Sequence, residues 1–435
     1  MENQRCKGMQ DLLPDDMLRF RHIEDTFRTC CLKWGYQEVR TPTLEYLHLF
    51  TATGTLTPHM LGRVYSFLDW DGWSGERVVL RPDGTIPVAR LYINNLICSK
   101  AAKGGREEAQ ELNNSLFTAK PHRLFYVTNI FAFEETGKEK RERWQCGTEF
   151  LGGAKFAADG EVILLAEEVM RKLGFANIEL QLSHAGLIKT LIKELKLNSS
   201  EEAKVTSRVL GGDWQALIEA KSINPEFSRF LSQLLNLRGK SRAFLQNIKA
   251  LSQQVSSNLE PSLKDFIDIA TLLDSLSCSY EIDITAIRDF EYYTGVCFQL
   301  LADGEKIGGG GRYDALIPLM NGRDIPACGF GLYVDSIMKL LPLGRKEKGE
   351  SGILITGEEL TTEILGTCFT LAQSLRDVGY AVELGFTSRE ELDYRWIILV
   401  SGKEPFPLVL TDRQTKQQRK AASIADILSI LGEYR

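Results

Sequence analysis

The sequence lacks the cysteine and histidine patterns of metal-binding and disulfide-stapled proteins. It has nine cysteines and five histidines, but no Cys-x-x-Cys pair and no metal-ligand spacing among the histidines. An odd, scattered set of cysteines that includes the neighbours Cys30 and Cys31 is typical of reduced thiols in the cytosol. We therefore expect no metal site and a cytoplasmic protein.

The chain also has no long apolar run and no excess of basic residues. No apolar stretch approaches the ~18 residues that a membrane-spanning helix needs, and the N-terminus does not resemble a signal peptide. The formal net charge is −6, whereas nucleic-acid-binding domains are typically basic. These features predict no membrane partner and argue against tRNA as a partner.

The residues that are present fit a globular protein with more than one domain. Of the 435 residues, 43% are hydrophobic and 25% are charged, as in ordinary globular chains. This length predicts two or three domains with room for a real core.

Apolar periodicity predicts an α+β fold. Apolar residues recur at helical spacing over 15–34 and 161–173, and a shorter helical pattern covers 86–96. Residues 99–119 are polar and predict an exposed loop or a flexible insertion, and residues 134–143 predict a charged hairpin. Expected strands cover 36–40, 64–68, 77–80, 123–133, 145–150, 280–301 and 325–332, with an Asp-Gly turn at Asp71-Gly72.

Two further regions have their own character. Residues 186–277 show helical patterns broken by turn-forming residues, which predicts a helical insertion within a domain over 1–340. A Gly- and Lys-rich linker over 341–351 leads to a small α/β domain over 352–435 with a largely parallel or mixed sheet. There the expected strands are 353–356, 381–384, 396–400 and 408–410, and the expected helices are 361–378 and 424–431.

The segment Gly308–Asp314 contains four consecutive glycines followed by Arg-Tyr-Asp. Such a run marks either a flexible loop or a close approach of the backbone to another backbone or a ligand. It lies between the apolar stretch 294–301 and the helix-like stretch 315–320, which favours a strand-to-helix turn. No Gly-Lys-Ser/Thr follows, so the run is not a P-loop.

Several segments in order along almost the whole chain resemble class II aminoacyl-tRNA synthetases, and in particular histidyl-tRNA synthetase. The resemblance implies an antiparallel sheet core with a helical insertion, and a C-terminal domain similar to a shortened anticodon-binding domain. The matching segments are Lys7–Pro14, Arg40–Glu45 (motif 1), Leu80–Arg90, Phe131–Glu149 (motif 2), Ile287–Thr294, Gly308–Asp314 and Gly329–Ser336 (motif 3).

The resemblance also implies a pocket for free histidine. Such a ligand needs an anion for its amino group, hydrogen-bond partners for its imidazole, and walls. Asp83 stands where the family usually has glutamate near the amino group, so its reach is one methylene shorter. The glycine run would be the strand that backs this pocket, with Arg312 and Asp314 as structural partners. The implied histidine-binding residues are Asp83, Thr85, Gln145, Glu149, Arg288, Tyr292, Tyr293, Gly309, Gly310 and Tyr313.

Each of these residues also has a purely structural interpretation. Tyr293 could be a core aromatic residue, Glu149 a charge at a strand edge, and Thr85 a helix N-cap. Arg288 could bind the carboxylate of histidine or form a structural ion pair.

Two arginines that serve synthetase chemistry are absent. The family places one at motif 2 and one at motif 3 to bind the phosphates of ATP, where this sequence has Ala132 and Ser336. Losing one preorganised donor typically costs ~10²–10³ in rate, and a phosphate-stabilising arginine can contribute ~10³–10⁵. We therefore expect no catalytic residue and no adenylation, unless a nearby cation substitutes: Lys138, Lys140, Arg141 or Arg143.

This loss, together with segments Leu80–Leu91 and Leu235–Gly239, resembles the family of ATP phosphoribosyltransferase regulatory subunits. The resemblance implies a non-catalytic subunit without a cofactor, which controls a short-form catalytic subunit in the first step of histidine biosynthesis. It further implies homodimers within a hetero-octamer and free histidine as the effector. The alternatives are a genuine histidyl-tRNA synthetase, a pseudo-synthetase that binds RNA or signals, and an amino-acid ligase with a non-tRNA acceptor.

Overall fold

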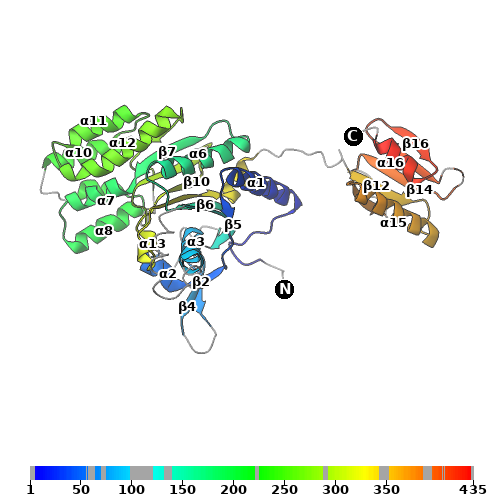
Figure 1. The fold of residues 1–435 in the computed structure, drawn as a ribbon, viewed down its shortest axis with the longest axis horizontal. Helices are drawn as coiled ribbons and strands as arrows, with labels where there is room; N and C mark the ends of the chain where they lie inside the picture. Colours follow the sequence, from blue (N-terminus) through cyan, green and yellow to red (C-terminus); the bar gives the residue numbers. More distant parts are fainter. Residues whose placement is uncertain are drawn as a thin grey trace, which may run out of the picture. The chain divides into compact units, whose positions relative to one another are not determined.

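The computed structural model describes residues 5–54, 56, 64–69, 75–97, 121–131, 140–220, 225–287, 292–341, 352–385, 394–403, 405 and 407–432. The chain divides into two compact units, Met1–Leu341 and Pro342–Arg435 (Figure 1). No helix in these described stretches is long and apolar enough to cross a membrane.

The first unit is built around a sheet of eight strands in the order β1-β5-β6-β11-β10-β9-β7-β8. Neighbouring strands are antiparallel, except that β1 and β8 at the two edges run parallel to β5 and β7. The strands are β1 (Gln37–Glu38), β5 (His122–Phe131), β6 (Glu142–Leu151), β7 (Glu179–His184), β8 (Glu281–Ile282), β9 (Val296–Ala302), β10 (Glu305–Arg312) and β11 (Ala327–Tyr333). With the helices described next, this sheet confirms the predicted α+β class.

Helices α1 (Pro14–Lys33) and α6 (Ala157–Lys172) cover one face of the sheet (Figure 1). Their apolar positions pack against sheet residues, as when the ring of Phe27 meets the edges of Phe125 and Phe330. Helix α14 (Val334–Leu340) continues from β11 and joins the same core.

The opposite face carries a smaller layer and a second core. The layer is a three-stranded sheet in the order β2-β4-β3 together with short helices. Buried Val79, Ile86, Tyr126 and Tyr313 belong to its core. Its elements are β2 (Leu44–Tyr46), α2 (Leu47–Ala52), β3 (Ser66–Leu68), β4 (Arg77–Leu80), α3 (Thr85–Leu91), a π-helical turn (Tyr92–Ile97) and α13 (Leu316–Leu319).

A helical insertion lies between β7 and β8, as the predicted fold requires (Figure 1). Asn198 begins α8 by accepting from the amides of Ser200 at 3.1 Å and Glu201 at 3.0 Å, and Gly212, with a φ of 88°, follows its end. The helices are α7 (Ala185–Glu194), α8 (Ser199–Leu210), α9 (Gln215–Glu219), α10 (Pro225–Asn236), α11 (Arg242–Ser252), a 3₁₀ turn (Ser257–Leu259) and α12 (Glu260–Ser275).

The second unit has a five-stranded sheet in the order β13-β12-β14-β15-β16. It is mixed, because β12 pairs in parallel with β13 and β14 while β15 and β16 are antiparallel. Both helices contribute to one core with alternate sheet residues, so they cover the same face. The elements are β12 (Gly352–Gly357), α15 (Thr362–Asp377), β13 (Ala381–Gly385), β14 (Trp396–Val400), β15 (Leu408–Asp412), β16 (Gln417–Ala421) and α16 (Ile424–Gly432).

Two local predictions were wrong. The stretch 280–301 is not one strand, because Asp283 accepts from the amide (2.8 Å) and the hydroxyl (2.7 Å) of Thr285 and turns the chain after β8. For the glycine run, the strand-to-helix turn is wrong and the expectation that the run is a strand is confirmed, because it belongs to β10 and pairs on both sides. The predicted Asp71-Gly72 turn, the loop over 99–119 and most of the hairpin and linker lie outside the described residues.

Candidate functional site

Five glycines form a floor at the centre of the large sheet. Gly147 on β6 lies opposite Gly331 on β11, which lies opposite Gly309 on β10; Gly329 likewise lies opposite Gly311. Residues directly opposite each other share one face of a sheet. We call Gly147, Gly309, Gly311, Gly329 and Gly331 the glycine floor.

Only one of the two glycines predicted to bind histidine belongs to this floor. Gly309 does, but Gly310 lies opposite Phe330, whose ring packs in the core beneath α1 and α6. Successive strand residues face opposite sides of a sheet, so Gly309 and Gly310 cannot both lie on the face that carries the site.

Three polar or aromatic side chains lie over the glycine floor. A Cβ at Gly329 would come within 2.3 Å of Glu149 Oε2, and one at Gly331 within 2.1 Å of Gln145 Nε2. A Cβ at Gly147 would come within 2.3 Å of Tyr126 Cζ. Gly147, Gly329 and Gly331 therefore leave space for these side chains, whereas a Cβ at Gly309 or Gly311 would meet a backbone oxygen at 2.8 Å or 2.7 Å.

Glu149 is the most buried acidic group of the site, with 1% of its surface exposed. Its carboxylate accepts hydrogen bonds from the hydroxyls of Tyr126, at 3.2 Å, and Tyr313. Burial raises the pKa of Glu149 to about 8, although hydrogen bonds from Tyr313, Thr85 and Tyr126 oppose the rise. Its interpretation as a charge at a strand edge is wrong.

Asp83 places a second acidic group near Glu149, at the start of α3. Its Oδ1 accepts from the amide of Ile86 at 3.0 Å, and burial raises the pKa of Asp83 to about 6. Its negative charge also contributes to the raised pKa of Glu149. Thr85 is the first residue of the helix and its side chain hydrogen-bonds Glu149, so its interpretation as the N-cap is wrong.

Aromatic rings surround the two acids. Tyr292 lies against Tyr293, with ring centroids 4.6 Å apart, and meets Tyr313 edge-on at 5.8 Å. Burial raises the pKa of the Tyr126, Tyr292, Tyr293 and Tyr313 hydroxyls, which therefore stay protonated and act as hydrogen-bond donors. We call the set the acid–tyrosine cluster: Asp83, Tyr126, Glu149, Tyr292, Tyr293 and Tyr313.

Tyr126 is the member of this cluster that sequence reasoning missed. It faces Gly147 across the β5–β6 pair, and Gly84 also leaves space for its ring, since a Cβ there would lie 2.2 Å from Tyr126 Cε2. A tyrosine paired with a glycine on the neighbouring strand could have indicated this contact, but the pair is recognised only when the strand register is known.

Gln145 adds an unused acceptor to the site. Its Oε1 is buried and has no hydrogen-bond partner among the described residues. The buried Glu149, the half-buried Asp83, an amide oxygen without a partner among the described residues and aromatic walls suit a small cationic ligand that also donates hydrogen bonds. Arg288, which the sequence adds to this set, lies outside the described residues, as does Ala132.

Lys140, one of the cations that could substitute for the missing arginines, pairs with the residue that precedes Ser336. Ser336 is partly exposed on α14, directly after Asp335, which accepts from the Trp144 amide at 2.8 Å and pairs with Lys140 at 3.2 Å. Arg141 donates to the Tyr65 hydroxyl at 3.3 Å. No group of three His, Cys, Asp or Glu side chains within the described ranges could hold a metal ion.

The largely antiparallel sheet fits the histidyl-tRNA synthetase class, and the chain belongs to that class by its sequence. The family model described as histidyl-tRNA synthetase matches residues 8–103 and 109–337. An ATP phosphoribosyltransferase regulatory subunit/histidyl-tRNA synthetase from Bacillus halodurans aligns with a TM-score of 0.75 and 24% identity, over 93% of this chain and 99% of that one. The apo histidyl-tRNA synthetase of S. aureus aligns with a TM-score of 0.65 and 21% identity, over 99% of each chain. These likenesses confirm the predicted class II fold.

Sequence similarity narrows the class further. An ATP phosphoribosyltransferase regulatory subunit from Dehalococcoides mccartyi is 44% identical over 427 residues, which cover 98% of both chains. The histidine–tRNA ligase of Methanosarcina acetivorans is 33% identical over 78% of this chain and 76% of the ligase. The chain belongs to the family of ATP phosphoribosyltransferase regulatory subunits, as its motifs predicted.

Proposed function

We propose that this protein is the regulatory subunit of an ATP phosphoribosyltransferase and acts in the first step of histidine biosynthesis. The observation that carries the proposal is the 44% identity to a regulatory subunit over 98% of both chains. The similarity to a histidine–tRNA ligase is lower and covers less of each chain. The subunit would be required for the activity of a short-form catalytic partner, which binds the substrates, and for feedback control by histidine.

We infer that the protein has no adenylation activity of its own and uses no cofactor. By resemblance, Ser336 and Ala132 replace the two arginines that would stabilise the phosphates of ATP. Lys140, one of the candidate replacements, already neutralises Asp335 at 3.2 Å. Moving it to a phosphate would leave that carboxylate without its cation, which counts against a rescue.

We also propose that free histidine binds at the acid–tyrosine cluster. Its ammonium would face Asp83, and its imidazole would hydrogen-bond Glu149 between the tyrosines. Gln145 Oε1, a buried acceptor with no partner in the described part of the chain, is available to a donor of the ligand. A histidine bound with different affinity in two quaternary states would shift activity, typically by ~1–3 kcal/mol of coupling free energy.

The proposed assembly is a homodimer within a hetero-octamer in the cytoplasm. The outer strands β2 and β3 of the small sheet expose three apolar side chains on one face, Leu44, Tyr46 and Phe67, each more than 40% accessible. Exposed apolar residues gathered on one layer favour a protein contact. The eight described cysteines are free thiols, which agrees with a reducing compartment.

The deciding experiment mixes the purified protein with a short-form catalytic subunit and measures phosphoribosyl-ATP formation with and without histidine. We expect stimulation, co-elution and inhibition by histidine. A Tyr313→Phe variant should still stimulate but should need more histidine for inhibition, whereas Glu161→Gln, altered in an ion pair away from the cluster, should behave as wild type. Absence of both stimulation and co-elution would refute the regulatory role.

A second candidate function is histidyl-tRNA synthetase, because the family model of that name matches most of the chain. It predicts histidine-dependent exchange of pyrophosphate into ATP and charging of tRNA. Turnover in either assay would establish it and would overturn the inference that adenylation is lost.

A further inference from the structure

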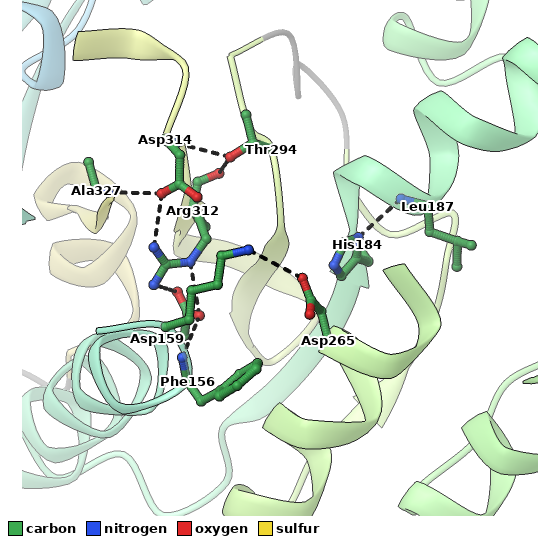
Figure 2. A network of polar contacts seen from close by, with 10 residues as sticks. Phe156, Asp159, His184, Leu187, Asp265, Thr294, Arg312, Asp314 and Ala327 are labelled. Atoms are coloured by element: carbon green, nitrogen blue, oxygen red, sulfur yellow. Dashed lines mark hydrogen bonds and ion pairs between the residues drawn. The ribbon is translucent and has the colours of Figure 1, made fainter. Parts of the chain in front are cut away.

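Arg312 ends the glycine-rich strand β10 with a buried ion network (Figure 2). It is 3% exposed, and its Nη2 and Nε lie 2.8 Å and 3.0 Å from the two carboxylate oxygens of Asp159 on α6. Its Nη1 lies 2.9 Å from Asp314 Oδ1. One guanidinium therefore joins a helix, a strand and the loop that follows it.

The same residues fix both neighbours of Tyr313. On one side, Arg312 is held by Asp159; on the other, Asp314 Oδ1 also accepts from the Ala327 amide at 2.9 Å. The amide of Tyr313 itself donates to the carbonyl of Ala327 at 2.8 Å. The Tyr313 hydroxyl can then reach Glu149 from only a narrow range of backbone positions.

The network also holds the segment that carries Tyr292 and Tyr293. The Thr294 amide donates to the Arg312 carbonyl at 2.7 Å, and the Asp314 amide donates to Thr294 Oγ1 at 3.0 Å (Figure 2). From the helical insertion, Lys189 Nζ donates to the carbonyl of Tyr293 at 2.7 Å. The two tyrosine-bearing segments are thus bonded to each other directly behind the cluster.

A buried ion pair of this kind is weak evidence for stability alone. Removing two charges from water carries a desolvation cost for each ion, and replacing such a pair by apolar residues of similar volume often leaves a protein as stable or more stable. What the pair supplies is direction, because the planar guanidinium holds one carboxylate through the Nε hydrogen bond and the Nη2 ion contact. The geometry of the Arg312–Asp159 pair therefore suits residues that fix the positions of their neighbours rather than residues that only stabilise the fold.

We propose that Arg312 and Asp159 are positioning residues, which hold Tyr313 and the Tyr292–Tyr293 segment in register around Glu149. This inference deepens the proposed histidine site and rests on it for its ligand. Arg312 touches no ligand in this scheme; it acts through the tyrosine beside it.

The chain offers a matched control on the same helix. Glu161 on α6 forms a bidentate pair with Arg123 on β5, at 2.6 Å and 2.8 Å, two residues beyond Asp159. This pair also joins α6 to the sheet but flanks no tyrosine of the cluster. Asp159→Asn and Glu161→Gln therefore make the same chemical change at two pairs, only one of which adjoins the site.

The test measures the environment of Tyr313 and the affinity for histidine separately. The protein is labelled with fluorotyrosine, and the Tyr313 resonance is assigned by its loss in Tyr313→Phe. We expect Asp159→Asn to move or broaden this resonance and to raise the dissociation constant for histidine about tenfold by calorimetry. Glu161→Gln should leave the resonance in place and change the dissociation constant by no more than about twofold.

An unmoved Tyr313 resonance in Asp159→Asn, or an equal change in Glu161→Gln, would overturn the positioning role. If wild type binds no histidine, the proposed histidine site fails, whereas the resonances still decide the positioning role. If Asp159→Asn does not fold, Asp314→Asn removes only the outer partner of Arg312. The Tyr313 resonance must then move in that folded variant, and an unmoved resonance would refute the inference.

Discussion

Glu149→Gln should remove a pH dependence of stability that the wild-type core carries between about pH 5 and 8. Burial raises the pKa of Glu149 from 4.5 to about 8 in the folded chain. Between those values the unfolded chain releases the proton of this carboxyl while the folded chain retains it. Unfolding therefore becomes easier as the pH rises, and the contribution levels off below about pH 4.5 and above about pH 8.

The size of the effect follows from the same two pKa values. While only the unfolded state is ionised, the free energy of unfolding falls by about 1.4 kcal/mol per pH unit. Over the whole window this amounts to at most on the order of 5 kcal/mol. Between about pH 5.5 and 7.5, the wild type should lose roughly 2.5 kcal/mol relative to Glu149→Gln.

The assay is urea unfolding of both proteins at several pH values, followed by tryptophan fluorescence. The difference between the two free energies of unfolding isolates Glu149, because other titrating groups are shared. The charge of Asp83 contributes to the raised pKa of Glu149. When both proteins also carry Asp83→Asn, the pH range over which their free energies of unfolding diverge should therefore end at a lower pH. A difference that stays flat from about pH 5.5 to 7.5 would refute the reasoning.

Three further predictions test the site and its floor. Tyr313→Phe removes one donor to Glu149 and should weaken histidine binding about five- to tenfold in calorimetry, since one such hydrogen bond contributes about 1–1.5 kcal/mol; unchanged affinity would contradict the proposed site. Gly147→Ala places a Cβ 2.3 Å from the Tyr126 ring and should lower the free energy of unfolding by ~1–3 kcal/mol. Gly366→Ala, in α15 with nothing within 4 Å, should instead raise it by about 0.5–1 kcal/mol, and the opposite order in denaturant unfolding would contradict the packing argument.

The sequence predicted those elements whose signal is local. The helical period placed α1 and α15 within a few residues, and the alternation in the second unit predicted β12, β13 and β14. Strand β16 was missed because its residues Gln417–Ala421 are mostly polar and exposed, and it forms only by pairing with β15. A strand created by its neighbour has little signal of its own.

The candidate site was predicted by residue type but not by arrangement. The motifs named both acids and three of the tyrosines, and the structure brings Asp83, Glu149 and Tyr313 together. They could not reveal that Tyr126 completes the cluster, because that depends on the β5–β6 register. They could not reveal Asp159 either, since its partner Arg312 lies 153 positions away in the chain.

The composition of the sheet centre argues that the cluster serves a ligand. Glycine in strand interiors weakens a sheet, yet three adjacent central strands, β6, β11 and β10, carry five on one face. The space that three of them leave, at Gly147, Gly331 and Gly329, is occupied by Tyr126, Gln145 and the carboxyl of Glu149, whose pKa burial raises to about 8. An apolar side chain at position 149 would fill the same space without the desolvation cost of an acid. Stability alone therefore does not account for the buried acid, which favours the proposed small cationic ligand with donor groups.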